Sequence, residues 1–276
     1  MRKLLFATAG IPLSTEKPST INGISRVKEL GLDAMELEFV RSINITKERA
    51  PEVKAAAEKH NVKLTCHAPY FINLNAIEPA KKYASMYRIE KSAEILHECG
   101  GWSMCFHPGF YLKMEKKKVF ETMKKRIKEI REKLDNKNID VWIRPETTGK
   151  PTQFGDYKEL LKLSQDIEKV MPVFDFSHIH ARTNGKYNTK EEFNQILEDI
   201  EFYLGKEGLE NMHIHLSGIN YNEKGERNHL ILEESDMNYQ DLIKVWKEFK
   251  IKGVVVSESP NIEEDALLMQ NYYKKI

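Results

Sequence analysis

Ile143-Arg144-Pro145-Glu146-Thr147-Thr148-Gly149 is the stretch that decides the fold. It follows residues 138–142, in which apolar and polar side chains alternate, and this alternation predicts a β-strand. Pro145 ends the strand because its nitrogen carries no hydrogen to donate to a neighbouring strand. We therefore expect Glu146 at the carboxyl end of a strand, on an edge that faces solvent.

The same arrangement recurs along the chain: a short apolar run ends on a residue type that binds metals. The six runs end at His67, His107, Glu146, Asp175 with His178, His215 and Glu258. Imidazole and carboxylate groups suit zinc, manganese and iron. Because one ion needs only about four protein ligands, this set indicates two or more ions. Glu146, in the middle of the set, is our candidate for a carboxylate shared between two ions.

Amphipathic helical patterns separate these apolar runs. One of them places Val119, Met123, Ile127, Ile130 and Leu134 on a single helical face. Eight strand–helix units follow one another without an obvious linker, and strict alternation predicts parallel strands joined by right-handed crossovers. Eight units in about 250 residues are typical of a closed (β/α)8 TIM barrel. We predict one such α/β domain over residues 1–276, with the metal site at the carboxyl-terminal rim of the strands.

An open, doubly wound sheet is the alternative architecture for the same alternation of strands and helices. The positions of the candidate ligands favour the barrel, because closure brings all the carboxyl strand ends to one rim. In an open sheet the third and eighth strands would lie too far apart to share a metal.

The composition is that of a protein we expect in the cytoplasm. The net charge of +1 implies no strong overall attraction to nucleic acid or membrane, although a local basic patch could still bind phosphate groups. No apolar run approaches the roughly 18 residues that a membrane-spanning helix needs. Cys66, Cys99 and Cys105 form no Cys-x-x-Cys pair, which indicates reduced thiols. We expect a cytoplasmic monomer without a membrane partner.

Two further histidines lie near the candidate ligands in the sequence. His213 precedes His215 by two residues, so we place it on the same strand face, one layer deeper in the barrel. His180 follows His178 by two residues, and we place it in a loop outside the ligand set. Residues 217–236 show no clear period and carry no prediction of a helix or strand.

The motifs around the candidate ligands resemble those of the endonuclease IV family of apurinic/apyrimidinic endonucleases, within the xylose-isomerase-like barrel superfamily. The motifs are His67-Ala68-Pro69-Tyr70-Phe71-Ile72-Asn73-Leu74, Phe106-His107-Pro108-Gly109, Glu146-Thr147-Thr148-Gly149, Asp175-Phe176-Ser177-His178, His215-Leu216 and Glu258. The resemblance covers nearly the whole chain and implies a zinc centre of two or three ions, with Mn²⁺ or Fe²⁺ as alternatives. It places His67 and His107 on the first ion, Glu146 between two ions, Asp175, His215 and Glu258 on the second, and His178 on the third.

The resemblance is weakest at the third ion, where the family carries an Asp-x-His pair. Here the corresponding segment reads Gly225-Glu226-Arg227-Asn228-His229. Glu226 stands where the family has Asp, Asn228 stands where it has His, and His229 comes one place later. Either His229 replaces the family histidine through a shifted loop, or the third site is weak or absent.

The resemblance implies an endonuclease that cuts the phosphodiester 5′ to abasic sites in damaged double-stranded DNA. A metal-bridging hydroxide would be the nucleophile, and Glu146 and Glu258 would be the catalytic carboxylates. Tyr70 would fill the gap that a flipped-out nucleotide leaves in the duplex. The expected substrate-binding residues are Tyr70, Asn73, Arg182 and Arg227.

Two other functions remain open. A sugar isomerase or epimerase could use one divalent metal held by Glu146, Asp175, His215 and Glu258, with Glu38 as a substrate residue. His67 and His107 argue against it, because such a centre does not require them as ligands. A non-catalytic barrel that binds metal or damaged DNA is the third possibility, and the altered segment around Glu226 is its only support.

Overall fold

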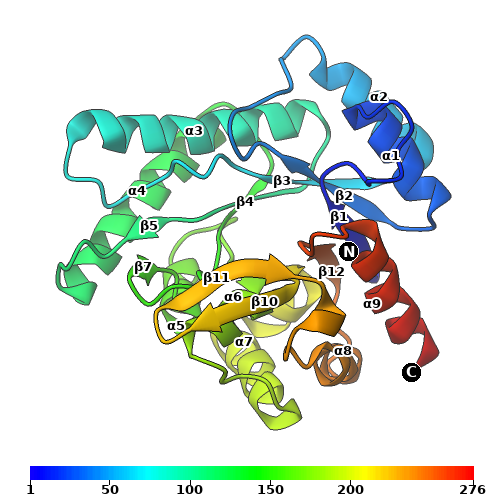
Figure 1. The fold of residues 1–276 in the computed structure, drawn as a ribbon. Helices are drawn as coiled ribbons and strands as arrows, with labels where there is room; N and C mark the ends of the chain where they lie inside the picture. Colours follow the sequence, from blue (N-terminus) through cyan, green and yellow to red (C-terminus); the bar gives the residue numbers. More distant parts are fainter.

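The computed structural model describes residues 1–276 and contains the eight-stranded parallel barrel that the sequence predicts (Figure 1). Its strands are β1 (Leu4–Ala9), β2 (Ala34–Glu38), β3 (Lys63–His67), β4 (Ser103–Phe106), β6 (Trp142–Pro145), β8 (Val173–Asp175), β9 (Met212–Leu216) and β12 (Gly253–Ser257). They follow chain order around the ring, and β12 pairs with β1. Between β6 and β8 only two isolated bridges, Ile143 to Val170 and Glu146 to Val173, complete the ring.

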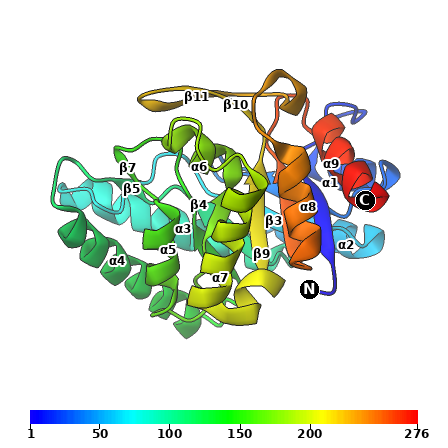
Figure 2. The same ribbon diagram turned by 90° about the horizontal axis from the view of Figure 1, so that it is seen from below.

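Helices surround the barrel and pack their apolar faces against the strands (Figures 1 and 2). They are α1 (Thr20–Glu29), α2 (Ala50–His60), α3 (Pro79–Glu98), α4 (Lys116–Asn136), α5 (Tyr157–Ser164), α6 (Phe176–Arg182), α7 (Lys190–Glu210), α8 (Tyr239–Glu248) and α9 (Glu263–Lys275). The predicted apolar face of α4 is fully buried. None of these helices combines the length and the apolar character needed to cross a bilayer.

The segment without a clear period is an ordered hairpin. Strand β10 (Gly218–Asn222) pairs antiparallel with β11 (Gly225–Leu230), and a 3-10 turn, η1 (Leu232–Glu234), follows. The hairpin crosses the front of the barrel in Figure 1 and lies along its upper edge in Figure 2. A second small pair, β5 (Gly109–Phe110) with β7 (Gln153–Phe154), joins the loops that follow β4 and β6.

Two predictions for the segment after β8 were wrong. Asp175 ends the strand and caps α6 at once, because its Oδ1 accepts a hydrogen bond from the His178 backbone N–H at 2.8 Å. His178 therefore lies in the first turn of a helix and not at a strand end. His180 lies on the same helix, fully buried, and not in a loop.

Gly253 opens β12 at a point where the barrel leaves no room for a side chain. Its φ is +137°, and a Cβ there would lie 1.8 Å from the Met212 carbonyl oxygen. Gly31 also has a positive φ of +77°, but no atom lies within 4 Å of its would-be Cβ. Substitutions at the two glycines can therefore separate the free-energy cost of a positive φ from the free-energy cost of a steric clash.

We expect Gly31→Ala to lower the free energy of unfolding by about 1 kcal/mol, the cost of a left-handed backbone. Gly253→Ala should lower it by roughly 2 kcal/mol more, because overpacking adds its own cost. Urea unfolding followed by circular dichroism measures both losses. Equal losses in the two variants would show that β12 can shift away from Met212 at little cost.

Candidate metal centre

Glu146 lies at the centre of the rim and collects imidazoles from several strand ends. Its carboxylate oxygens lie 3.3 Å from His67 Nε2, 3.3 Å from His107 Nε2, 3.1 Å from His178 Nδ1 and 3.5 Å from His215 Nδ1. The side chain is fully buried, so the prediction that Glu146 faces solvent was wrong. The loop after β6 and the hairpin cover it: a Cβ placed on Gly149 would lie 2.6 Å from Glu226.

A second group of ligand-type atoms shares Glu146. The donor atoms of Glu146, Asp175, His215 and Glu258 all lie within 4.8 Å of one another. His215 Nδ1 is 3.3 Å from Glu258 Oε1. His107, Glu146 and His178 form another such group, as do His67, Cys105 and Glu146. The structure thus brings all seven candidate ligands to one rim, with Glu146 common to three groups.

The hydrogen bonding of these groups fits a metal cluster. Both oxygens of Glu146, Oδ2 of Asp175 and Nδ1 of His215 are buried, and none has a hydrogen-bond partner. An unsatisfied buried polar group costs on the order of 1–3 kcal/mol, so four at one place need an explanation. Divalent cations among carboxylate oxygens and imidazole nitrogens would satisfy all four at once.

Two of the histidines are oriented as metal ligands usually are. His67 Nδ1 lies 2.7 Å from the Ala68 carbonyl oxygen, and His229 Nδ1 lies 3.1 Å from that of Glu258. In each ring a proton on Nδ1 donates to the carbonyl, which leaves the lone pair of Nε2 for a ligand. In His178, Nδ1 lies 3.0 Å from the Thr147 carbonyl oxygen but also 3.0 Å from Asp175 Oδ2 and 3.1 Å from Glu146 Oε1, whereas Nε2 faces Glu226.

The hairpin places Glu226 and His229 beside the His178 ring, with Glu226 next to its Nε2 atom. Glu226 Oε2 is 3.5 Å from His178 Nε2, and Glu226 Oε1 is 3.9 Å from His229 Nε2. Residues three apart on a regular strand point to opposite faces. Here Asn220 pairs with Asn228 and Tyr221 with Glu226, so Arg227 is an extra residue in β11. This bulge turns the side chains of Glu226 and His229 toward the rim. His229 has to point this way if it is to replace the family histidine.

The carboxylates and imidazoles at the rim shift one another's pKa values. Burial by itself would lower the pKa of His67, but the neighbouring carboxylate of Glu146 raises it to about 10. Burial by itself would raise the pKa of Glu258, but His215 lowers it to about 2. For Glu226 the same balance, with His178 as the opposing charge, lowers the pKa to about 2. The carboxylates and imidazoles at this rim therefore each favour the charged form of the other.

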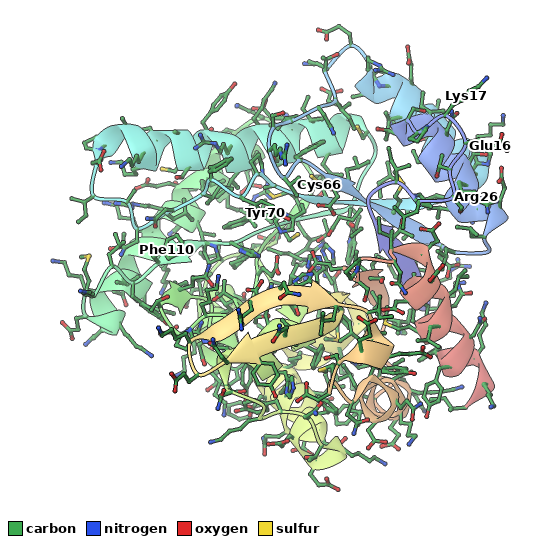
Figure 3. All side chains as sticks on the ribbon, viewed as in Figure 1. Glu16, Lys17, Arg26, Cys66, Tyr70 and Phe110 are labelled. Atoms are coloured by element: carbon green, nitrogen blue, oxygen red, sulfur yellow. The ribbon has the colours of Figure 1, made fainter.

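The expected substrate-binding residues differ in their exposure and in whether their side chains already form hydrogen bonds within the protein. Tyr70 is 58% exposed, its ring lies 5.4 Å from that of His67, and Figure 3 shows it between α3 and the hairpin. Arg227 is exposed at the bulge. Asn73 Oδ1 instead accepts hydrogen bonds from the backbone N–H groups of Asn75 and Phe110.

Arg182 is engaged with the loop after β6. Its guanidinium donates to the carbonyl oxygens of Lys150 at 2.6 Å, Gln153 at 3.0 Å and Thr148 at 3.3 Å. These contacts fix the loop that begins at Glu146. Arg182 thus contacts the loop at the rim, and its prediction as a substrate-binding residue stays a prediction.

Sequence reasoning missed Glu36, which is fully buried in β2. Its two oxygens lie 3.0 Å from His213 Nε2 and 2.9 Å from His215 Nε2. The available signal was the alternation in Met35-Glu36-Leu37-Glu38, which puts both glutamates on the inward face of the strand. Glu38 lies nearer the rim, with a buried Oε1 that lacks a partner, and burial raises its pKa to about 8.

An eight-stranded parallel barrel with a cluster of ligand-type residues at its carboxyl rim defines a TIM barrel with a candidate metal centre. The chain belongs to the xylose isomerase-like TIM barrel family, which it matches over residues 24–275. An uncharacterized protein of Methanocaldococcus jannaschii is 44% identical over 273 residues, which span 99% of this chain and 98% of that protein. A probable endonuclease 4 of Mycoplasma pneumoniae is 24% identical over 212 residues, 74% of this chain and 71% of that protein.

Solved structures share the fold at low sequence identity. Endonuclease IV from Thermus thermophilus superposes with a TM-score of 0.75 at 17% identity, over 98% of this chain and all of that one. A D-tagatose 3-epimerase-like protein gives a TM-score of 0.72 at 19% identity, over 97% of this chain and 96% of that one. The fold is therefore common to a nuclease and an epimerase-like protein, and these similarities do not choose between the two functions.

We expect His229→Ala to lower the metal content of the fully loaded protein by one ion per chain, because His229 faces His178 and Glu226. Asn228→Ala is the matched control, since the Asn228 side chain bonds only within the hairpin. Inductively coupled plasma mass spectrometry of the metal-loaded proteins measures the difference. The same metal content in both variants would show that His229 is not a ligand.

Metal binding should weaken as the pH falls. His67 is protonated below its pKa of about 10, so at pH 7 an ion must displace that proton. For each proton displaced, affinity should drop about tenfold per pH unit. Competition with a chelator between pH 6 and 8, corrected for the chelator's own protonation, measures this slope. An affinity that does not change over this range would mean that no protonated imidazole has to give up its proton.

Proposed function

We propose that this protein is a metal-dependent nuclease of the endonuclease IV kind, which cuts damaged double-stranded DNA on the 5′ side of abasic sites. The observation that carries the proposal is the pair His67 and His107, each 3.3 Å from Glu146. A one-ion centre is complete with Glu146, Asp175, His215 and Glu258, so the two histidines add ligands that only a second ion needs. The relative named probable endonuclease 4 supports the same choice.

The candidate ligands divide among three ions. His67, His107 and Glu146 would hold the first, Glu146, Asp175, His215 and Glu258 the second, and His178, Glu226 and His229 the third. The mixture of imidazole and carboxylate donors suits Zn²⁺ best, with Mn²⁺ and Fe²⁺ as alternatives. When bound, such ions supply a nucleophilic hydroxide at neutral pH and neutralise charge on the phosphate.

The residues of the chain position the substrate around this centre. Tyr70 projects from the loop after β3, exposed and against the ring of His67, where it can fill the space left by a missing base. Arg182 fixes the loop after Glu146 through carbonyl oxygens, so the bridging carboxylate keeps its place. Arg227, exposed on the hairpin, is available to a DNA phosphate.

A sugar epimerase is the second candidate, and one observation favours it. Glu38 Oε1 is buried near the rim without a hydrogen-bond partner, as a group that awaits a substrate hydroxyl would be. Such an enzyme would transfer a proton between carboxylates and a bound sugar beside a single metal. It leaves His67 and His107 without a function.

We expect the zinc-loaded protein to cut a duplex that contains one abasic site, on its 5′ side. Glu146→Gln should lower the rate at least about 100-fold, because it removes a charge shared by two ions. Glu201→Gln, on the exposed surface of α7, is the control and should cut at the wild-type rate. Gel electrophoresis of end-labelled DNA measures the rates.

The same preparation should be incubated with ketohexoses. Absence of cutting by zinc-, manganese- and iron-loaded protein would contradict the nuclease proposal. Epimerisation of a ketohexose without any cutting would establish the second candidate in its place.

A further inference from the structure

A continuous line of buried polar groups runs through the barrel interior beneath the metal centre. Arg144 Nε donates to Ser103 Oγ at 2.8 Å, and Ser103 Oγ lies 3.0 Å from His213 Nδ1. His213 Nε2 lies 3.0 Å from Glu36 Oε2, and Glu36 Oε1 lies 2.9 Å from His215 Nε2. All five side chains are at most 1% exposed. They come from β2, β4, β6 and β9, so only the closed barrel brings them together.

The order of donors along this line is set at its lower end. A guanidinium has no acceptor, so Arg144 can only donate to Ser103. The other hydrogen-bond partner of Ser103 Oγ is His213 Nδ1, 3.0 Å away, and we assign the hydroxyl hydrogen to this contact. His213 in its neutral form therefore carries its proton on Nε2, which faces Glu36.

At its upper end the line reaches a candidate metal ligand. Glu36 Oε1 faces Nε2 of His215, which places the ring proton on that nitrogen. Nδ1 keeps its lone pair and lies 3.3 Å from Glu258 Oε1, with no hydrogen-bond partner. In His67 and His229 a backbone carbonyl holds the ring proton on one nitrogen, whereas in His215 the carboxylate of Glu36 does so. A carboxylate partner makes the imidazole a more basic ligand.

We infer that Glu36 is a positioning residue for the metal centre: together with His213, Ser103 and Arg144 it holds the proton of His215 on Nε2 and so presents Nδ1 to the ion that Glu146, Asp175 and Glu258 share. The inference rests on the metal centre of the proposed function. It does not depend on the substrate, because it concerns the affinity of the site for its ion.

The same residues could instead be a separate metal site inside the barrel. Glu36, His213 and His215 have donor atoms within 4.8 Å of one another, and Cys105 Sγ lies 3.8 Å from His215 Nε2. Donors around one tetrahedral zinc ion, with bonds of about 2.0–2.1 Å, lie roughly 3.3 Å apart. The separations of 2.9 and 3.0 Å between Glu36 and the two rings are shorter than this spacing, which favours direct contact between charged or polar groups, although His213 Nε2 itself makes no hydrogen bond in the structure.

Glu36→Gln tests the inference with little change in shape. The amide can donate to His215 Nε2, which would move the ring proton to Nδ1 and remove a ligand. We expect the affinity of one ion to fall about 10- to 100-fold, with the other ions retained. Ser103→Ala leaves Glu36 beside His215 and should have a smaller effect in the same direction. Titration with Co²⁺, followed by its visible absorption, measures both; unchanged affinity in Glu36→Gln would overturn the inference.

The wild-type protein gives a test that does not depend on how a variant folds. Long-range ¹H–¹⁵N NMR of the zinc-loaded protein should find protons on Nε2 of both His213 and His215. A proton on Nδ1 of His215, or an anomalous zinc peak between Glu36, His213 and Cys105 in a crystal, would overturn the inference. Since these measurements contain no DNA, the inference can fail while abasic-site cutting is observed, and it can hold where no cutting occurs.

Discussion

The structure depends on one buried carboxylate. Glu146 is fully enclosed, accepts no hydrogen bond, and has imidazoles from β3, the loop after β4, α6 and β9 within 3.5 Å of its oxygens. It also makes one of the two bridges that complete the ring between β6 and β8. The weakest seam of the barrel therefore lies where the ligand-type charges are densest. Ions at this rim would join strand ends that the backbone holds together with few hydrogen bonds.

The sequence predicted those parts of the structure that depend on neighbours along the chain. His67, Glu146 and Glu258 each end a short apolar run, and a parallel barrel sends all such ends to one rim. Glu36 does not end such a run, and the alternation around it places it on one strand face without showing that this face lies inside the barrel. Only closure of the barrel shows that β9 and β2, which are not neighbours in the sheet, place His213 and Glu36 together.

The errors around α6 and the missing prediction for the hairpin have a common cause. Asp175 caps a helix with Oδ1 and directs Oδ2 into the candidate centre, so one carboxylate serves a local and a long-range function. In β11 the positions of Glu226 and His229 depend on a bulge, and a bulge is defined by the partner strand. In both segments the sequence shows the residue types, whereas the direction of each side chain follows from tertiary pairing.

The candidate ligands at the rim form two groups, and only one of them helps to distinguish between the proposed functions. Glu146, Asp175, His215 and Glu258 form a carboxylate-rich half that would serve a nuclease or an epimerase equally well. His67, His107 and the hairpin residues form a histidine-rich half on the other side of Glu146. In a one-ion enzyme that second half would have no ligand function, because the carboxylate-rich half already supplies the usual number of ligands. The number of ions that the protein binds therefore distinguishes the functions more directly than its fold does.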